Sequence, residues 1–383
     1  MKNNNYWRLI LVLTGIIAVL NLAGFSKDFC DFYTDNIYAL SHNLIAFLTS
    51  WCPFAIGEII MYLGAVALFL QLLIIVLLIF FRKKKKYTTF VKKYSKAVLM
   101  SIVITLFLFT VNWTVPFRAR VLKASDNTRT EYSLSELEYV RATVVEQLNR
   151  ITLLLNRDEN GNLIYDYTDE DIAASMRSEK ADYPRLDGFY PTMKPAICSP
   201  FLEWMNIGGY NYVYTMEPTY NLYVDPITMP VLKAHEYAHN MGYYKENEGE
   251  FLSCITLVHS DNLFLQYCGY LEMYWYLDEA VYSALADMYL EPGEEPTREK
   301  LAQISEAYSL LPQLSEQVEQ DLYYAWSLSV ELYEENIDET FEETFAETSS
   351  SVASVGWDLQ SDVLKENTYD GLTLMLLQYY ISE

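Results

Sequence analysis

The first third of the chain contains three long apolar segments separated by polar stretches. Residues 9–24, 59–81 and 97–113 carry no Asp, Glu, Lys or Arg. Each approaches or exceeds the roughly 17 to 25 residues that an α-helix needs to cross a bilayer. A cleaved signal peptide is the alternative for residues 9–24, but two further apolar segments follow it and no small-residue cleavage site stands out near Phe25. The pattern therefore predicts a membrane domain, residues 1–116, with three retained transmembrane helices.

Charged residues predict the orientation of these helices. Residues 82–86 read Arg-Lys-Lys-Lys-Lys and three more lysines follow before residue 97, so the loop between the second and third spans is predicted to be cytoplasmic. The loop at 25–58 holds four acidic residues against one lysine and is predicted to lie outside. Residues 117–383 should then also lie outside the cytoplasm.

The predicted outer part is strongly acidic. Residues 117–383 hold 47 Asp and Glu against 16 Lys and Arg, a balance of −31. This charge argues against binding nucleic acid or anionic lipid through a basic surface and is typical of a well-hydrated external domain. Cys30 and Cys52 both fall in the predicted outer loop and could pair in an oxidising compartment, whereas no Cys-x-x-Cys spacing indicates a thiolate metal site.

Helical periodicity dominates after the third span, so the fold is predicted to be mainly α. The apolar stretch 251–278 raises the possibility of a fourth span, but its centre reads His-Ser-Asp-Asn, which favours two core helices joined by a polar turn. The acidic and then Ser-rich segment 334–355 is predicted to be mobile. The predicted elements are helices at 133–156, 230–241, 246–259, 263–290, 301–335 and 361–380, and a short strand between Pro218 and Pro226.

Two of the four histidines lie four residues apart, at His235 and His239. On a helix these positions share a face, so the two imidazoles can bind one metal ion, while Glu236 can reach a water molecule without binding the metal. This is the His-Glu-x-x-His arrangement of zinc hydrolases, with two ligands and a general base in five residues. The alternative is a pair of core histidines satisfied by hydrogen bonds.

Three acidic residues after Gly242 are candidates for the third ligand. Gly242 permits the chain to reverse, which returns the next helix to the metal. Glu246 and Glu250 share a helix face, so Glu246 is predicted to be the ligand and Glu250 to accept a hydrogen bond from a ligand imidazole. Glu248 points away and is predicted to be a solvated residue of the helix N-terminus. His259 is the alternative third ligand.

The segment HEYAHNMGYYKENEGEF, residues 235–251, resembles the zincin metallopeptidases of the glutamate-ligand type. In that group a Glu-x-x-x-Asp/Asn pair lies on a following helix. Its first residue is the third metal ligand, and its second is a hydrogen-bonding partner of a ligand. The whole layout is similar to a bacterial membrane-anchored family, domain-of-unknown-function family 3810. Its members have three N-terminal spans, His-Glu-x-x-His followed closely by Glu-x-Glu, and a C-terminal segment similar to residues 361–380. Gly249 and Glu250 depart from the Ala-Asn that this family more often has.

The resemblance implies a zinc metalloendopeptidase of the bacterial cell membrane, with a zincin-like α+β domain, residues 117–383, outside the cytoplasm. Zn²⁺ on His235, His239 and Glu246 would activate a water molecule, and Glu236 would accept its proton and pass it to the leaving amine.

The expected partners are a peptide or protein substrate and the lipid bilayer. The strand at 219–224 could pair with an extended substrate, as edge strands of zincins do, or could be a plain sheet edge. Intramembrane cleavage is disfavoured because the motif lies about 120 residues past the third span. A non-catalytic sensor that keeps a structural zinc site is the alternative function.

Overall fold

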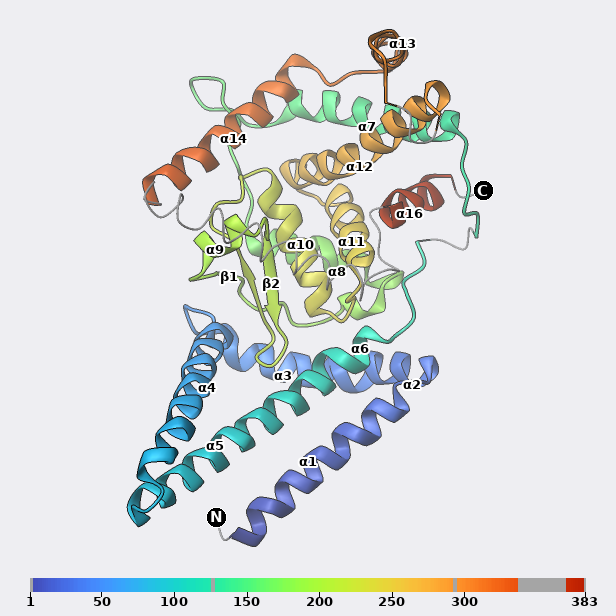
Figure 1. Cartoon of the computed structure of the whole chain (residues 1–383). Helices are drawn as coiled ribbons and strands as arrows, with labels where there is room; N and C mark the ends of the chain where they lie inside the picture. The colour runs from blue at the N-terminus through green and yellow to red at the C-terminus, as the bar shows by residue number, and fades with distance from the viewer. Residues whose placement is uncertain (1–2, 125–127, 292–294, 337–369, 382–383) are drawn as a thin grey trace.

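In a computed structural model, three long helices lie at one end of the molecule and a larger, mainly helical domain lies at the other (Figure 1). The structure describes residues 3–124, 128–291, 295–336 and 370–381. The predominance of helix confirms the prediction of a mainly α fold. The predicted mobile segment falls almost entirely outside the described residues.

Three helices of the described chain are long and apolar enough to cross a membrane, as predicted. They cover Asn4–Ala23, Ile56–Phe81 and Lys85–Phe117. The third is longer than the sequence pattern indicated, because the helix begins within the lysine-rich segment. The elements at this end of the molecule are α1 (Asn3–Ala23), α2 (Lys27–Phe32), the π-helical turn η1 (Tyr33–Tyr38), α3 (Ala39–Ser50), α4 (Ile56–Phe81), α5 (Lys85–Phe109), a second π-helical turn η2 (Thr110–Thr114) and α6 (Val115–Phe117).

The predicted outer loop at 25–58 is mostly helical. Elements α2, η1 and α3 follow one another without a break and lie across the ends of the long helices, beneath the domain (Figure 1). Cys30 and Cys52, which the sequence suggested could pair in an oxidising compartment, do not form a disulfide, because both thiols are free. Helical rise explains this: the backbone between them is helical almost throughout and separates them by about 30 Å, whereas a disulfide needs Cα atoms within roughly 7 Å.

The larger domain is built around α10, α11 and α12, which pack against one another and are covered by α7, α8 and α16 (Figure 1). Ser133 begins α7 and forms a capping box with Glu136. The described elements of the domain are α7 (Leu134–Ile151), η3 (Thr152–Leu154), α8 (Asp169–Ser178), η4 (Glu179–Ala181), η5 (Pro184–Leu186), β1 (Lys194–Pro195), α9 (Ser199–Trp204), β2 (Gly209–Tyr212), β3 (Glu217–Tyr220), α10 (Thr228–Asn240), α11 (Glu246–Val258), α12 (Leu263–Tyr289), α13 (Arg298–Ser309), α14 (Glu316–Asn336) and α16 (Asp370–Tyr380).

The apolar stretch at 251–278 forms two core helices, as the sequence predicted. Helices α11 and α12 meet at the polar residues 259–262, and their apolar side chains form the centre of the largest buried cluster. Two predicted boundaries were wrong. Helix α10 begins at Thr228, so Pro230 is its third residue, and the predicted helix at 301–335 is divided into α13 and α14.

The small sheet has the strand order β1-β3-β2, with β1 parallel and β2 antiparallel to β3. The predicted substrate-pairing strand at 219–224 was wrong, because Thr219 and Tyr220 belong to the central strand β3, and the next residues lie outside the sheet. Strand β2 forms an edge of the sheet instead, and it contacts α10.

Buried charges join the long helices to the domain. Glu217, at the start of β3, is 1% exposed, pairs with the buried Lys194 and accepts hydrogen bonds from the backbone N–H groups of Ile56 and Gly57 at the start of α4. Glu58, also fully buried, accepts from backbone N–H groups before α9. The predicted boundary between the membrane domain and the larger domain, at residues 116 and 117, falls within α6. The contacts of Glu217 and Glu58 join the two domains across this boundary.

Candidate metal centre

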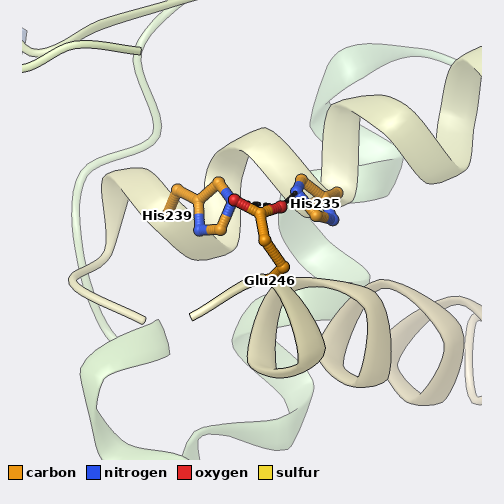
Figure 2. A group of neighbouring side chains, drawn as sticks. All are labelled: His235, His239 and Glu246. Atoms are coloured by element: carbon orange, nitrogen blue, oxygen red, sulfur yellow. Dashed lines mark ion pairs between the residues drawn. The ribbon is translucent and has the colours of Figure 1, made fainter. Parts of the chain in front are cut away.

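Helix α10 carries the two motif histidines on its face toward α11. The i, i+4 spacing places their rings next to each other on that face, with centroids 4.4 Å apart and the ring planes nearly perpendicular (Figure 2). Both side chains are about nine-tenths buried. The remaining motif positions fill the core, since Tyr237 and Ala238 are almost completely buried.

Glu246 reaches the histidines from the first residue of α11 (Figure 2). The chain turns between the helices at Gly242, whose φ of 94° lies in the left-handed region that glycine adopts without strain. One Glu246 oxygen lies 3.3 Å from His235 Nε2 and 3.6 Å from His239 Nε2. The link Met241–Lys245 is therefore long enough to bring the carboxylate back to the histidines.

The donor set fits a zinc ion. One nitrogen from each histidine and one Glu246 oxygen lie within 4.8 Å of one another. A tetrahedral zinc ion with ligand bonds of ~2.0–2.2 Å separates its ligand atoms by about 3.4 Å, which matches the two histidine–carboxylate distances. Two imidazoles and one carboxylate are also a ligand set found in catalytic zinc sites, where the fourth position is open.

The Nδ1 atoms of the two imidazoles face different neighbours, while both Nε2 atoms face Glu246. His239 Nδ1 donates to the backbone oxygen of Tyr243 over 2.7 Å, which fixes the proton on Nδ1. His235 Nδ1 is buried without a good hydrogen bond, and the nearest acceptor, Glu250 Oε1, lies 3.4 Å away. Glu250 therefore lies beside His235 Nδ1, and its role as the hydrogen-bond acceptor of this imidazole stays a prediction.

Electrostatics at the cluster favour ionised partners. Burial alone would raise the pKa of Glu246, but the two adjacent imidazoles outweigh it and hold that pKa well below its usual range. Burial lowers the pKa of His235, yet Glu250 and Glu246 outweigh this effect and raise it. Negative charge is therefore concentrated beside the imidazole nitrogens. A divalent cation bound there would be stabilised by this charge.

Glu236 lies next to this cluster but outside its donor set. The side chain is 4% exposed, and burial raises the pKa of the carboxyl to about 7. Asn211 of β2 donates to Glu236 Oε2 over 2.6 Å and to the Glu236 backbone oxygen over 3.0 Å. Gly209 allows this approach, because a Cβ at that position would lie 3.2 Å from Glu236 Oε1 and 2.5 Å from the backbone oxygen of Thr219.

Sequence reasoning missed a polar chain behind Glu236. Asn240 donates to Asn211 Oδ1 over 2.8 Å, and Asn240 Oδ1 lies 2.6 Å from His42 Nε2, which must carry the proton because an amide oxygen only accepts. Three side chains from α3, α10 and β2 thus support the Glu236 carboxylate. No local pattern marks contacts between residues 42 and 240, although a histidine on the buried face of an amphipathic helix is a weak signal.

Glu272 of α12 is a further carboxylate that the sequence analysis overlooked. It lines the same cavity as the histidines, and burial, reinforced by Glu250, raises its pKa to about 8. A signal was available, since Glu272 stands one turn after Cys268 on a helix face that is otherwise apolar.

Glu248 and His259 lie away from the histidine pair. The prediction that Glu248 is solvated was wrong: the side chain is 3% exposed and accepts from the backbone N–H groups of Lys245 and Leu122. It caps α11 and fastens the segment that follows α6. His259 is the C-cap residue of α11, about 20 Å of helix rise from Glu246, and its Nδ1 contacts Glu179.

A cavity of about 660 Å³ opens beside the cluster. Edge strand β2 and the preceding residues form one wall, and the motif side chains of α10 form another. Its lining includes Trp113, near the C-terminal end of the third long helix, and Met205, Ile207, Gly209, Tyr210, Asn211, Val231, Leu232, His235, Glu236, His239, Glu246, Glu250 and Glu272.

A family model described as a protein of unknown function, DUF3810, matches residues 33–347. The chain belongs to this family. The matched region contains α3, two of the three long helices and the whole histidine–glutamate cluster. No curated protein and no solved structure matches the chain.

Replacing Glu246 distinguishes the candidate carboxylates. The Glu246→Ala protein is expected to lose zinc, since this residue supplies one of three converging donor atoms. The Glu248→Gln protein should keep zinc and lose only about 1 kcal/mol of stability, the usual cost of weakening a helix cap. Zinc content of the purified full-length proteins, measured by mass spectrometry, checks both. Zinc loss from the Glu248 variant alone would reassign the ligand.

Proposed function

We propose that this protein is a membrane-anchored zinc metallopeptidase that hydrolyses peptide bonds outside the cytoplasm. The observation that carries the proposal is the convergence of His235, His239 and Glu246 in one cavity with the buried carboxylate of Glu236. Two ligand nitrogens, a ligand oxygen and a separate carboxylate are the groups that zinc-dependent hydrolysis needs.

Each residue has a distinct role in this proposal. His235, His239 and Glu246 hold the zinc ion, which when bound supplies Lewis-acid polarisation of a peptide carbonyl and of the attacking water. Glu236 accepts a proton from that water and transfers it to the leaving amine. Asn211 binds one oxygen of Glu236, which orients the carboxylate and leaves the other oxygen for proton transfer.

The sheet edge supports a peptide as the substrate. Strand β2 borders the cavity with Gly209, Tyr210 and Asn211 and has only one strand neighbour, β3. An extended polypeptide can add to such an edge through backbone hydrogen bonds, which recognise the peptide independently of its side chains. The helix with the motif, the returning Glu246 and the edge strand together support the zincin-like domain of this proposal.

The charge of the turn between α4 and α5 supports the outer location. This turn, with Lys83 and Lys84, lies at the end of the long helices farthest from the domain (Figure 1). Under the positive-inside rule the lysine-rich end is cytoplasmic and the domain is outside.

Metal removal tests the proposal. Full-length protein treated with 1,10-phenanthroline should lose hydrolysis of a randomised peptide library, and stoichiometric Zn²⁺ should restore it, since the chemistry depends on the bound ion. Cleavage is measured by mass spectrometry of the products. Cleavage that persists in metal-free protein would contradict a zinc peptidase. Zinc-loaded protein that cuts no library member would favour the non-catalytic sensor.

A further inference from the structure

Helix α3 and the turn before it carry an unbroken apolar stripe on the face opposite the domain. Between residues 37 and 51 every exposed side chain is apolar, and the exposed positions repeat at the spacing of one helix face. The opposite face, with His42, Ala46 and Thr49, is buried against the domain. The stripe consists of Ile37, Leu40, Leu44, Phe47, Leu48 and Trp51.

The position of this stripe indicates that it contacts the lipid bilayer. The segment lies across the ends of the long helices and below the domain, so the stripe faces the side on which those helices extend (Figure 1). An amphipathic helix with one wholly apolar face and an aromatic residue at its end is typical of a segment lying in the membrane interface.

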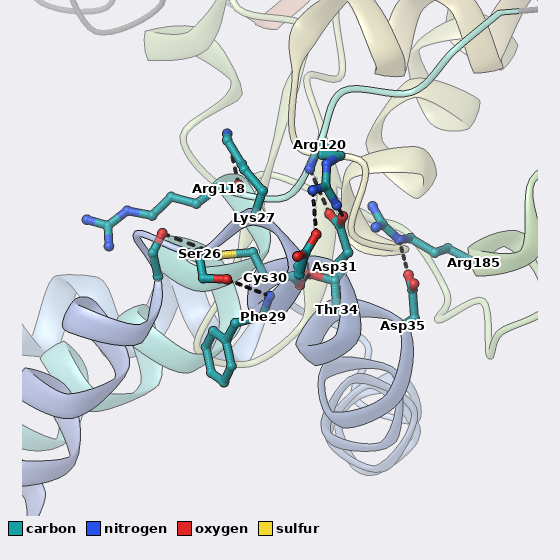
Figure 3. Close-up of polar contacts among 12 residues, drawn as sticks. Ser26, Lys27, Phe29, Cys30, Asp31, Thr34, Asp35, Arg118, Arg120 and Arg185 are labelled. Carbon is teal, nitrogen blue, oxygen red and sulfur yellow. Dashed lines mark hydrogen bonds and ion pairs between the residues drawn. The ribbon is translucent and has the colours of Figure 1, made fainter.

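A packed core fixes the domain on this segment. Tyr33 and Tyr38 of η1, Val115 of α6, Met216 of the β2–β3 connection and Tyr244 of the α10–α11 link belong to one buried cluster. Ion pairs reinforce it at the surface, where Arg120 pairs with Asp28 and Asp31 and Arg185 pairs with Asp35 (Figure 3). These pairs are drawn between the α2–η1 segment and the chain beyond α6.

The metal ligands lie two contacts from the third candidate span. The ring of Tyr244 stacks on that of His239 with centroids 6.3 Å apart, and its hydroxyl donates to the backbone oxygen of Asn112 over 2.7 Å. The neighbouring Trp113 lines the cavity itself. Trp113 and the motif histidines, about 120 residues apart in the sequence, therefore lie at the same cavity in the fold.

The depth of Trp113 places the cavity at the bilayer boundary. Lys96 is the last cation before the uncharged part of the span. From Ala97 to Trp113 the helix rises by ~24 Å, against a hydrocarbon core of ~30 Å. Trp113 thus lies within about 6 Å of the outer hydrocarbon edge if the core begins at Ala97 and the helix runs along the bilayer normal. A tilted helix would place it deeper.

We propose that the substrate is a polypeptide anchored in the same membrane and cut in the segment next to its anchor. This rests on the proposed peptidase function. A cavity bordered by Trp113 at the membrane surface and by edge strand β2 admits a chain that emerges from the bilayer and runs along β2. The shared feature is attachment to the membrane, through either a transmembrane helix or a lipid.

Site-directed spin labelling tests the position of the domain on the membrane. A nitroxide is attached at Leu44→Cys in full-length protein in liposomes, with Cys52 and Cys198 replaced by alanine. The control carries the label at Leu310→Cys, an 82% exposed position next to α13 at the far end of the domain. Collisions with oxygen should exceed those with a water-soluble nickel complex at position 44, and the reverse should hold at 310. The same water exposure at both positions overturns the membrane contact.

Cleavage mapping tests the substrate class. Wild-type and Glu236→Gln proteins are reconstituted with a randomised segment of about 30 residues, attached to a transmembrane helix, to a lipid or to no anchor. In both anchored forms cuts should be about ten-fold enriched in the ten or so residues nearest the anchor, within ~35 Å of extended chain. Cuts spread evenly along the segment, or equal cutting of the free segment, overturn the inference.

The two tests separate this inference from the function on which it rests. If zinc-loaded protein cuts none of the three substrates, the peptidase proposal fails and the substrate class falls with it, while the label at position 44 still reports whether α3 lies in lipid. If cutting occurs but ignores the anchor, the peptidase stands and the membrane-anchored substrate is wrong.

Discussion

The Glu236→Gln protein is expected to keep its zinc and to lose its peptidase activity. Glutamine has the same shape, and its amide oxygen can still accept the hydrogen bond that Asn211 donates to Glu236. Glutamine cannot accept the proton of the attacking water, and loss of general-base catalysis typically costs about 10²–10⁴-fold in rate. The measurement is kcat/KM on a cleaved library peptide, alongside the zinc content of the same preparation.

A matched control is available on α9. Glu203 also accepts a hydrogen bond from an asparagine amide, Asn221 Nδ2, over 2.6 Å, but it does not line the cavity. The Glu203→Gln protein should retain both zinc and activity. If the Glu236 variant hydrolyses peptides at the wild-type rate, Glu236 is not the base. If it loses zinc, Glu236 belongs to the metal-binding set.

Replacing either motif histidine by alanine should remove the metal. His235 and His239 each contribute one of the three converging donor atoms, and no other histidine of the chain lies in the cavity lining. The loss in zinc affinity should exceed the 10–100-fold effect typical of replacing an outer contact. Competition with a chromophoric chelator on full-length protein gives the dissociation constant.

His259→Ala provides the comparison for these variants. Its imidazole lies at the other end of α11, is 40% exposed and contacts Glu179 rather than the cluster. Zinc affinity should be unchanged in this protein. If His259→Ala released zinc while His235→Ala retained it, the alternative ligand considered from the sequence would be correct and the proposed centre would be wrong.

The parts of the site that the sequence predicted are local in the chain. The spacing of His235 and His239, the turn at Gly242 and the return of Glu246 lie within 12 residues, where helix geometry alone relates one side chain to another. The cap at Ser133 was predictable for the same reason. Each of these inferences needed only the period of a helix and the chemistry of its ends.

The parts that the sequence did not predict depend on packing between distant segments. His42, Asn211 and Asn240 form their chain because α3, β2 and α10 meet, which no local pattern specifies. Glu248 has the sequence context of an exposed helix start, yet the backbone of Leu122 covers it. Its burial follows from where the chain beyond α6 runs.

The segment at 25–58 shows a different limit. Its acidic residues correctly separate it from the lysine-rich turn, but a count of charges says nothing about backbone conformation. The apolar repeat of α3 is visible in the sequence, yet periodicity alone does not tell whether an apolar face meets protein or lipid. The buried side of α3 decides this, because the domain already occupies the face with His42 and Thr49.

Zinc K-edge X-ray absorption of the full-length protein tests the central claim most directly. The account predicts one zinc ion per chain with two imidazole nitrogens and carboxylate or water oxygens at ~2.0–2.2 Å, as His235, His239 and Glu246 would provide. A protein that purifies and reloads without stoichiometric zinc, or whose zinc has sulfur ligands at ~2.3 Å, would contradict it.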